Sequence, residues 1–267
     1  MGILGLIGGG LMATAIIKGL LKQGYPAKGL LVSDPDLSRR EFLEALGVST
    51  FQDNQEMLAT LEKKEAEGII LAIKPQVVKE ALTGLDFPNL PLLSIVAGYS
   101  VSALESLLPA GTRVLRAMPN TPALIGEGIT AVTAGTRSNE QELTWAEKIL
   151  SSLGKVVVVP EGLMNAVTGL SGSGPGFVYF FIEALIDGGV LAGLPRPLAR
   201  ELALQTVVGS ARMVAELQEH PAQLKDMVTS PGGTTITGLV ELEAAGVYGV
   251  LMKAVLSAAD KSEKLGE

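Results

Sequence analysis

The sequence contains no cysteine, a single histidine and few aromatic residues. The absence of cysteine from the 267 residues excludes disulfides, thiolate zinc sites and thiol nucleophiles. His220 is the only histidine, so a multi-histidine metal site cannot be built, and a Ser-His-Asp relay would have to use this one residue. His220 precedes Pro221 at a predicted helix start, and we expect it to serve the structure rather than catalysis. We therefore expect no metal site.

Positive charge and long apolar runs are also scarce. The chain has 21 Lys and Arg against 28 Asp and Glu, and this net charge of -7 disfavours nucleic acids and anionic membranes as partners. The first residues lack a basic n-region, so we expect no signal peptide. No window of about 18 residues is uniformly apolar, which argues against a membrane span. The stretch 177–194 is the most apolar later segment, and it predicts a helix buried in a core or subunit interface. We expect a cytoplasmic protein.

Short apolar runs alternate with amphipathic stretches in the first part of the chain. We expect strands at 3–7, 30–32, 68–72, 92–96, 113–117, 129–134 and 156–159, with helices at 12–23, 37–46, 101–108 and 139–153. Nearly continuous apolar strands between helices are typical of a doubly wound, mostly parallel sheet that is buried on both faces. The fold class predicted for this part is therefore α/β.

The pattern changes after Pro160, where strands cease. We expect helices at 162–170, 175–194, 197–217 and 247–264, and a shorter helix that starts near Gly233. The sequence thus predicts two domains, an α/β domain at 1–160 and an all-helical domain at 161–267. No low-complexity linker separates them.

A glycine-rich loop follows the first predicted strand and opens the first predicted helix. It has the form G-x-G-x-x-A, with Gly8, Gly10 and Ala13 at the defining positions. Gly8 permits a tight turn, Gly10 lets the backbone approach a pyrophosphate, and Ala13 lets the helix pack closely on the sheet. The helix N-terminus adds unpaired N–H groups for the phosphates, and Leu11 and Met12 lie in the same turn. This placement predicts a Rossmann domain that binds a nicotinamide dinucleotide.

The end of the second predicted strand offers two readings of the cofactor. Asp34 could accept hydrogen bonds from a ribose 2′-OH, which would favour NADH. Ser33, Arg39 and Arg40 could instead hold a 2′-phosphate, which would favour NADPH. The residues leave this choice open, and we expect NADPH with NADH as a possible alternative.

Four segments carry a resemblance to one enzyme family. They are residues 72–75, residues 116–123, the Ser-Gly-Ser-Gly-Pro run at 171–175, and residues 224–235, which end in Pro231-Gly232-Gly233-Thr234-Thr235. Together they resemble pyrroline-5-carboxylate reductases, which catalyse the last step of proline synthesis. The resemblance extends over essentially the whole chain. One departure is Leu11, where relatives commonly carry Asn, and it predicts a weaker polar contact near the pyrophosphate.

The resemblance implies an NAD(P)H-dependent imine reductase with a helical dimerisation domain. It implies that the helices of two subunits interleave, that each active site uses both chains, and that dimers often assemble into decamers. The substrate would be a cyclic imine that carries a carboxylate. Consecutive N–H groups at a glycine-rich helix start can converge on such an anion. The predicted substrate site comprises Val228, Ser230, Gly232, Gly233, Thr234 and Thr235, and the Thr235 hydroxyl is expected to orient the imine nitrogen as the catalytic residue.

Further cofactor contacts are expected at the carboxyl ends of the strands, where ligands bind in such sheets. Lys74 and Pro75, with the preceding Ala72, end one strand, and Lys74 either faces the cofactor or is a surface lysine. Ala97, Gly98 and Asn120 follow later strands and are expected to border the nicotinamide. Asn54 is expected near the adenine by resemblance only.

Two other functions fit parts of the sequence. A hydroxy-acid dehydrogenase would need a Lys or His acid for carbonyl chemistry, and Lys225 and His220 are the candidates after residue 160. A dinucleotide sensor without catalysis would keep Gly8 and Gly10 but could dispense with Thr235. The intact Thr234-Thr235 pair argues against the sensor.

Overall fold

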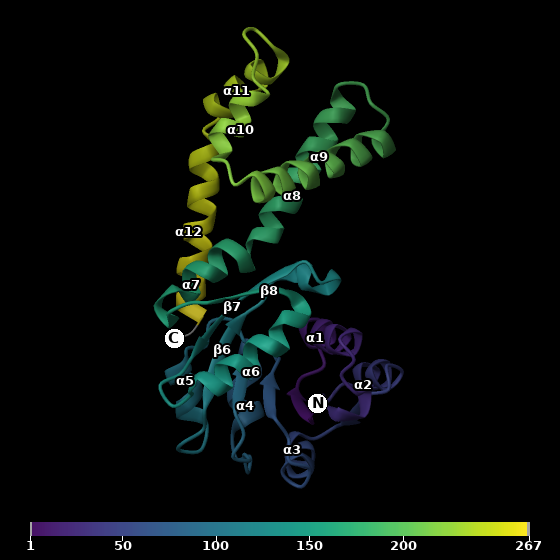
Figure 1. Ribbon diagram of the computed structural model, residues 1–267, viewed down its shortest axis with the longest axis vertical. Coiled ribbons are helices and arrows are strands. Elements are labelled where there is room, and N and C mark those ends of the chain that lie inside the picture. The colour runs from purple at the N-terminus through teal and green to yellow at the C-terminus, as the bar shows by residue number, and fades with distance from the viewer. Residues whose placement is uncertain (1, 266–267) are drawn as a thin grey trace. The chain divides into compact units, whose positions relative to one another are not determined.

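A computed structural model describes residues 2–265 of the chain (Figure 1). The described residues form two compact units, one of residues 2–173 with 257–265 and the other of residues 174–256. The functional division at residue 160 that the sequence predicts stays a prediction.

The first unit is built on one eight-stranded sheet. Its strands are β1 (Leu4–Ile7), β2 (Leu30–Ser33), β3 (Ser49–Phe51), β4 (Gly68–Leu71), β5 (Leu92–Ser94), β6 (Val114–Met118), β7 (Gly128–Ala134) and β8 (Gly154–Val158). They lie in the order β3-β2-β1-β4-β5-β6-β7-β8, and only the β6–β7 pair is antiparallel. The predicted α/β class with a mostly parallel sheet is confirmed.

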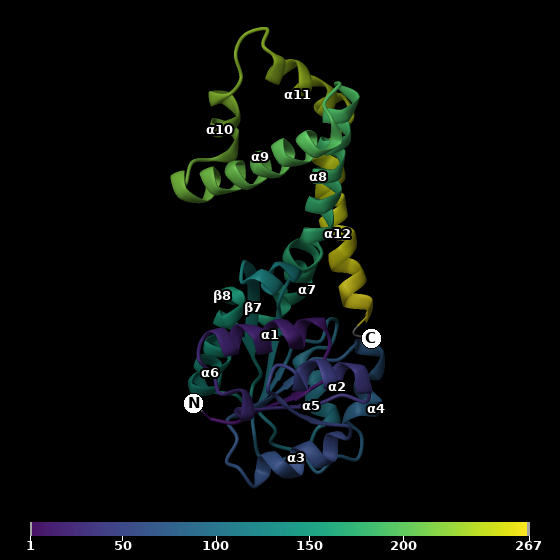
Figure 2. The same cartoon turned by 90° about the vertical axis from the view of Figure 1, so that its right-hand side faces the viewer.

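Helices cover both faces of this sheet (Figures 1 and 2). They are α1 (Leu11–Lys22), α2 (Leu37–Glu44), α3 (Asn54–Glu62), α4 (Val78–Leu82), α5 (Val101–Leu107) and α6 (Glu140–Leu150), and the short α7 (Met164–Val167) follows the last strand. Successive strand residues point to opposite faces. Leu6 therefore packs in one core with Ile16 of α1, whereas Ile7 packs in a second core with Leu61 of α3. Burial on both faces explains why the strands are apolar throughout.

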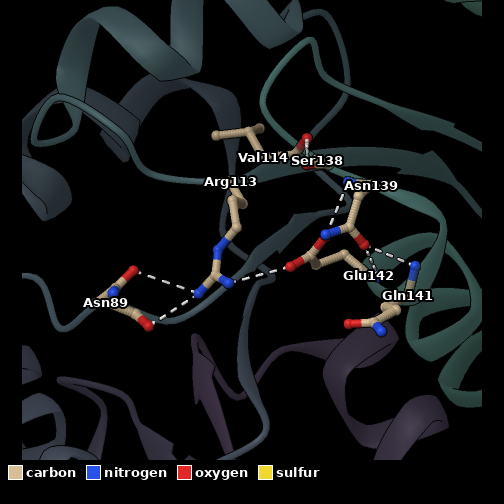
Figure 3. Close-up of polar contacts among 7 residues, drawn as sticks. All are labelled: Asn89, Arg113, Val114, Ser138, Asn139, Gln141 and Glu142. Atoms are coloured by element: carbon tan, nitrogen blue, oxygen red, sulfur yellow. Dashed lines mark hydrogen bonds and ion pairs between the residues drawn. The ribbon is translucent and has the colours of Figure 1, made fainter.

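The start of α6 is fixed by a capping box that also holds an ion pair (Figure 3). The Asn139 side chain accepts hydrogen bonds from the N–H groups of Gln141 and Glu142, and Glu142 Oε2 accepts one from Asn139 N at 2.8 Å. Glu142 Oε1 lies 3.1 Å from Arg113 Nη1, and Arg113 Nη2 donates to the carbonyl of Asn89. These contacts tie the helix start to the segments that flank β5 and β6.

The second unit consists of helices, as predicted. They are α8 (Gly174–Leu191), α9 (Arg196–Leu217), α10 (Pro221–Met227), α11 (Thr234–Ala244) and α12 (Val247–Leu265), the last of which ends among the residues of the first unit. Within the described part of this unit, α8 and α9 are the only helices that pack extensively on each other. Large apolar side chains stay open, with Phe180 73% and Tyr248 76% exposed. These helices therefore lack a core of their own.

One helical run among the described residues is long and apolar. By length and composition alone, the run Glu161–Leu191, which contains a π-helical turn at Thr168–Gly172, could cross a membrane. The same composition suits a helix that another protein chain covers. The expectation that the protein has no membrane partner stays a prediction.

Candidate active site

The carboxyl ends of the parallel strands β1, β4, β5 and β6 lie at one edge of the sheet. The predicted cofactor residues Gly8, Ala72, Ala97 and Asn120 follow these four strands in turn. Gly8 and Ala72 are in direct contact, because a Cβ added at Gly8 would lie 2.5 Å from the Ala72 carbonyl oxygen. The first turn of the chain thus meets the end of β4 at the edge where such sheets bind ligands.

The glycine loop has the geometry that a dinucleotide needs. Gly8 has a φ of +98°, a conformation that L side chains rarely adopt, and this makes the tight turn. A Cβ at Gly10 would meet no protein atom within 4 Å, so the space in front of the helix start is open. Gly10 caps α1 without a side-chain hydrogen bond, which leaves the first N–H groups of the helix without a partner inside it. The loop therefore fits a pyrophosphate.

The other residues of the loop differ in their exposure. Ala13 is fully buried between α1 and the sheet, and Met12 packs against the same core. Leu11, by contrast, is 57% exposed at the first position of the helix. The apolar Leu11 side chain therefore lies open to solvent at the start of α1.

A cleft of about 450 Å³ opens beside the glycine loop. Gly8, Ser33, Asp34 and Asn54 line it, so the structure brings together residues that are far apart in the sequence. The Asn54 side chain donates a hydrogen bond from Nδ2 to the Ala81 carbonyl at 3.1 Å. This bond joins α3 to α4 at the wall of the cleft that both residues line.

The cleft also contains residues that the sequence reasoning missed. Gln52 and Asp53 line it from the segment between β3 and α3, and neither element was predicted. The sequence does contain a signal for the start of α3, where the Asp53 carboxylate accepts a hydrogen bond from Glu56 N and caps the helix. An Asp three residues before a Glu is a helix-start pattern.

Asp34 joins the second strand to the glycine loop. Its Oδ2 atom accepts a hydrogen bond from Gly9 N at 2.7 Å, and Oδ1 accepts one from Asp36 N at 2.9 Å. Asp36 lies beside it, and hydrogen bonds from the hydroxyl and N–H of Ser38 lower the pKa of the Asp36 carboxyl. The Asp34 carboxylate therefore lies in the cleft lining, and the Asp36 carboxylate follows it at the start of α2.

The residues predicted for a 2′-phosphate are placed unequally. Ser33 is buried, with its hydroxyl 3.5 Å from the Leu6 carbonyl oxygen, so this side chain does not face the cleft as a free donor. Arg40 Nη1 donates to the carbonyls of Asp34 and Pro35 at 2.7 and 2.9 Å. Arg39 is exposed. Of these three side chains, Arg39 is the one for which the described residues provide no hydrogen-bond partner.

The remaining predicted cofactor residues are positioned by the strand ends. Lys74 is exposed and precedes a short 3-10 helix, Pro75–Val77. Gly98 turns the chain after β5 with a φ of +81°, next to the half-buried Ala97. The Asn120 side chain is almost buried and accepts a hydrogen bond from Ile129 N through Oδ1 at 3.0 Å. This bond joins the segment after β6 to the start of β7.

The predicted substrate loop leads into α11. Gly232 has a φ of +67°, and Gly233 is the N-cap, with no side-chain cap bond to the first turn. A Cβ at Gly233 would meet Ser230 Oγ, a side-chain end that can rotate away, so the residue of this turn that favours glycine is Gly232 with its positive φ. The N–H groups of Thr234 and Thr235 lie in the first turn, where a helix offers no internal acceptors. Val228 is 64% exposed at the start of the loop.

His220 caps a helix, in keeping with the structural role that the sequence predicts. Its Nδ1 atom accepts a hydrogen bond from Ala222 N at 3.2 Å, and its N–H donates to Gln223 Oε1 at 3.1 Å. Among residues 2–265, the side chains of His, Asp and Glu form no group of three or more that could hold a metal ion.

The sequence reasoning missed an ion pair between a buried arginine and a partly exposed glutamate. Arg116 of β6 is 5% exposed, and its Nη1 atom lies 3.5 Å from Glu161 Oε1. The same oxygen accepts a hydrogen bond from Val101 N, the first residue of α5, at 2.6 Å. Burial lowers the pKa of the Arg116 guanidinium, and the charge of Glu161 opposes that shift. No local pattern marks these residues, because Val101 and Glu161 are 60 positions apart.

Comparison with known proteins matches both parts of the chain. Residues 161–265 match the family model for pyrroline-5-carboxylate reductase dimerisation, and residues 3–98 match a model described as NADP oxidoreductase, coenzyme F420-dependent. Pyrroline-5-carboxylate reductase of Synechocystis is 47% identical and covers 99% of this chain and 98% of its own length. The Arabidopsis thaliana enzyme of the same name is 42% identical, over 98% of this chain and 95% of its own.

Solved structures agree with these relatives. A pyrroline-5-carboxylate reductase from Coxiella burnetii superposes with a TM-score of 0.89 at 32% identity and covers 100% of this chain and 99% of its own. The Plasmodium falciparum enzyme, solved with NADP bound, has the same TM-score at 31% identity, over 99% and 98% of the two chains. The chain therefore belongs to the pyrroline-5-carboxylate reductase family and is an NAD(P)H-dependent oxidoreductase that converts the cyclic imine to L-proline.

Proposed function

We propose that this chain holds the dinucleotide at the glycine loop and its adjoining cleft, and holds the imine at the loop of residues 228–235. The observation that carries the first half is the open space at the capless start of α1, beside a cleft of about 450 Å³. The second half is supported by the glycine turn before α11, whose first N–H groups suit a carboxylate.

The proposed chemistry at the imine depends on position more than on a dedicated acid. The reduced nicotinamide supplies the hydride. The backbone N–H groups of Thr234 and Thr235, with the Ser230 hydroxyl, bind the substrate carboxylate. Gly233 forms the turn, with its own N–H bonded to the Ser230 carbonyl at 3.0 Å, and the exposed Val228 borders the ring. Thr235 Oγ1 orients the ring nitrogen, so that the imine carbon is presented to the hydride. An imine is more basic than a ketone and arrives protonated, so no side chain has to deliver a proton.

Different residues around the cleft bind the adenosine, the pyrophosphate and the nicotinamide of the dinucleotide. Asn54 and Asp34 take the adenosine end, and the N–H groups of Leu11 and Met12 take the pyrophosphate. The strand-end residues Ala72, Lys74, Pro75, Ala97, Gly98 and Asn120 take the nicotinamide end. NADPH is the preferred cofactor in this proposal, with Arg39 at the 2′-phosphate, and the carboxylates of Asp34 and Asp36 keep that preference modest.

Homodimerisation is the second part of the proposal. The helices α8 to α12 leave large apolar side chains exposed, and a monomer rarely tolerates a patch of that extent. Burial of this surface against a second copy is the simplest arrangement with closed symmetry. Residues 161–267 would form the dimerisation and substrate-binding part, residues 1–160 the dinucleotide-binding part, and dimers could assemble into decamers. We place the protein in the cytoplasm, without nucleic-acid or membrane partners.

An activity assay tests the proposed function. Purified protein with NADPH or NADH should oxidise the cofactor only after pyrroline-5-carboxylate is added. A simple 2-keto acid at the same concentration is the control, because reduction of a carbonyl needs an acid that the loop at 228–235 lacks. Turnover of the keto acid but not of the imine would overturn the proposal.

A further inference from the structure

The loop between β5 and α5 is short and is held at both of its ends. At its entry, Ile95 N donates to the Leu71 carbonyl at 3.0 Å, which continues the β4–β5 ladder. At its exit, Val101 N donates to Glu161 Oε1 at 2.6 Å. Between these bonds lie Ala97 and the positive-φ turn at Gly98.

Glu161 is itself held by a buried cation. Arg116 pairs in register with Ser94, the last residue of β5, and lies on the sheet face that α5 covers. Within the described chain, Glu161 is the one carboxylate that forms an ion pair with this guanidinium. A buried cation is costly without a partner, so Arg116 favours the position of the Glu161 carboxylate in which it also accepts from Val101 N.

We infer that Glu161 is a positioning residue, which holds the exit of the β5–α5 loop so that Ala97 and Gly98 stay in place beside the nicotinamide. The inference rests on the proposed function, which puts this loop at the nicotinamide end. Glu161 acts through the Val101 N–H and touches neither ligand. Arg116 keeps the Glu161 carboxylate at that N–H.

The test separates the hydrogen bond from the charge. Loss of Glu161 alone leaves Arg116 buried without a partner and could prevent folding, so the variants are made in an Arg116→Met background. In that background, Glu161→Gln keeps an oxygen that can accept from Val101 N, whereas Glu161→Ala removes it. Both double variants lack the buried charge, and glutamine alone keeps an acceptor for Val101 N.

Two readouts follow, one of which needs no imine. We expect the Arg116→Met/Glu161→Ala protein to lose about 10- to 100-fold in kcat, since a loop misplaced near the reacting atoms disturbs the approach of the hydride. The Arg116→Met/Glu161→Gln protein should stay within about threefold of wild type. For binding, the alanine variant should weaken NADPH by about threefold or more, with 2′-phospho-ADP-ribose, which lacks the nicotinamide, unchanged.

A variant with lower stability but an intact loop is the control. Asn139→Ala removes the α6 capping box in the same unit, far from the strand-end loops, and should leave kcat and both affinities as in wild type. Equal kcat for the glutamine and alanine variants, or equal weakening of NADPH and the fragment, would overturn the role of Glu161. If the wild type fails to reduce the imine, the proposed function falls, and the comparison of NADPH with the fragment still decides whether Glu161 positions the loop.

Discussion

The carboxylate of Asp34 accepts a hydrogen bond from the backbone N–H of Gly9 at 2.7 Å. The bond joins the end of β2 to the turn that follows β1, and a Cβ at Gly9 would lie 3.3 Å from the same carboxylate oxygen. Asp34 therefore supports the glycine loop from behind while it lines the cleft beside it. The Asp34 side chain therefore both supports the glycine loop and places a negative charge where the ribose is proposed to bind.

The first prediction concerns cofactor choice. Asp34→Asn keeps an acceptor for Gly9 N but removes a negative charge that would repel a 2′-phosphate. We expect the ratio of kcat/KM for NADPH to that for NADH to rise about tenfold, which is about 1.4 kcal/mol. Steady-state kinetics with both cofactors measures this ratio, and an unchanged ratio would show that Asp34 does not face the 2′ position.

The two end glycines of the loop give a second prediction. Gly8→Ala should destabilise the protein by at least about 1 to 2 kcal/mol, because φ is +98° and the Ala72 carbonyl is 2.5 Å from the added carbon. Gly10→Ala should leave the melting temperature unchanged, since the methyl group enters open space.

The same Gly10 variant should bind NADPH about tenfold or more weakly, because the methyl group occupies the space proposed for the pyrophosphate. Calorimetric melting and equilibrium titration together separate the two effects. Wild-type NADPH affinity in a folded Gly10→Ala protein would mean that the pyrophosphate lies elsewhere.

A third prediction tests the dimer. Phe180 of α8 is 73% exposed in the single chain, and Phe180→Asp would place a charge in the proposed interface. We expect light scattering to show dimers or larger assemblies for wild type and a shift toward the 27.7 kDa monomer for the variant. Phe42→Asp on α2, where Phe42 is 44% exposed in the other unit, is the matched control and should not change the assembly.

The α6 capping box predicts a stability effect without an activity effect. Asn139→Ala removes the acceptor for Gln141 N and Glu142 N and should cost about 1 kcal/mol. Gln141→Ala, next to it, contributes only its backbone N–H to the box and should leave the free energy of unfolding unchanged (Figure 3). Denaturant unfolding of the two variants measures the difference, and equal free energies of unfolding would show that the capping box does not stabilise the protein.

Local patterns in the sequence predicted much of this structure. The turn at Gly8 and the helix that begins at Leu11 are encoded within a few adjacent residues, so the loop could be located from its spacing alone. The strand β3 was missed because three half-buried residues carry no periodic signal. The cleft wall at Gln52 and Asp53 was missed with it.

Contacts between distant segments could not be predicted. Nothing near Glu161 in the sequence indicates that its carboxylate meets Val101 N and Arg116, because the sheet order alone brings these segments together. Ser33 likewise contacts a distant segment, because its hydroxyl lies 3.5 Å from the carbonyl oxygen of Leu6 on the neighbouring strand. The phosphate contact expected of Ser33 stays a prediction, and the residue lines the cleft beside the glycine loop.

The measurement that tests the central claim most directly is the imine-reduction kcat/KM of Thr235→Ala beside that of Thr234→Ala. If the Thr235 hydroxyl orients the imine nitrogen, its loss should lower kcat/KM about 5- to 150-fold, which corresponds to about 1 to 3 kcal/mol, with NADPH affinity unchanged. Thr234→Ala keeps the backbone N–H proposed for the carboxylate and should cost less, and Thr235→Ser should restore most of the rate. Near-wild-type rates for both alanine variants would contradict the account and remove Thr235 from the mechanism.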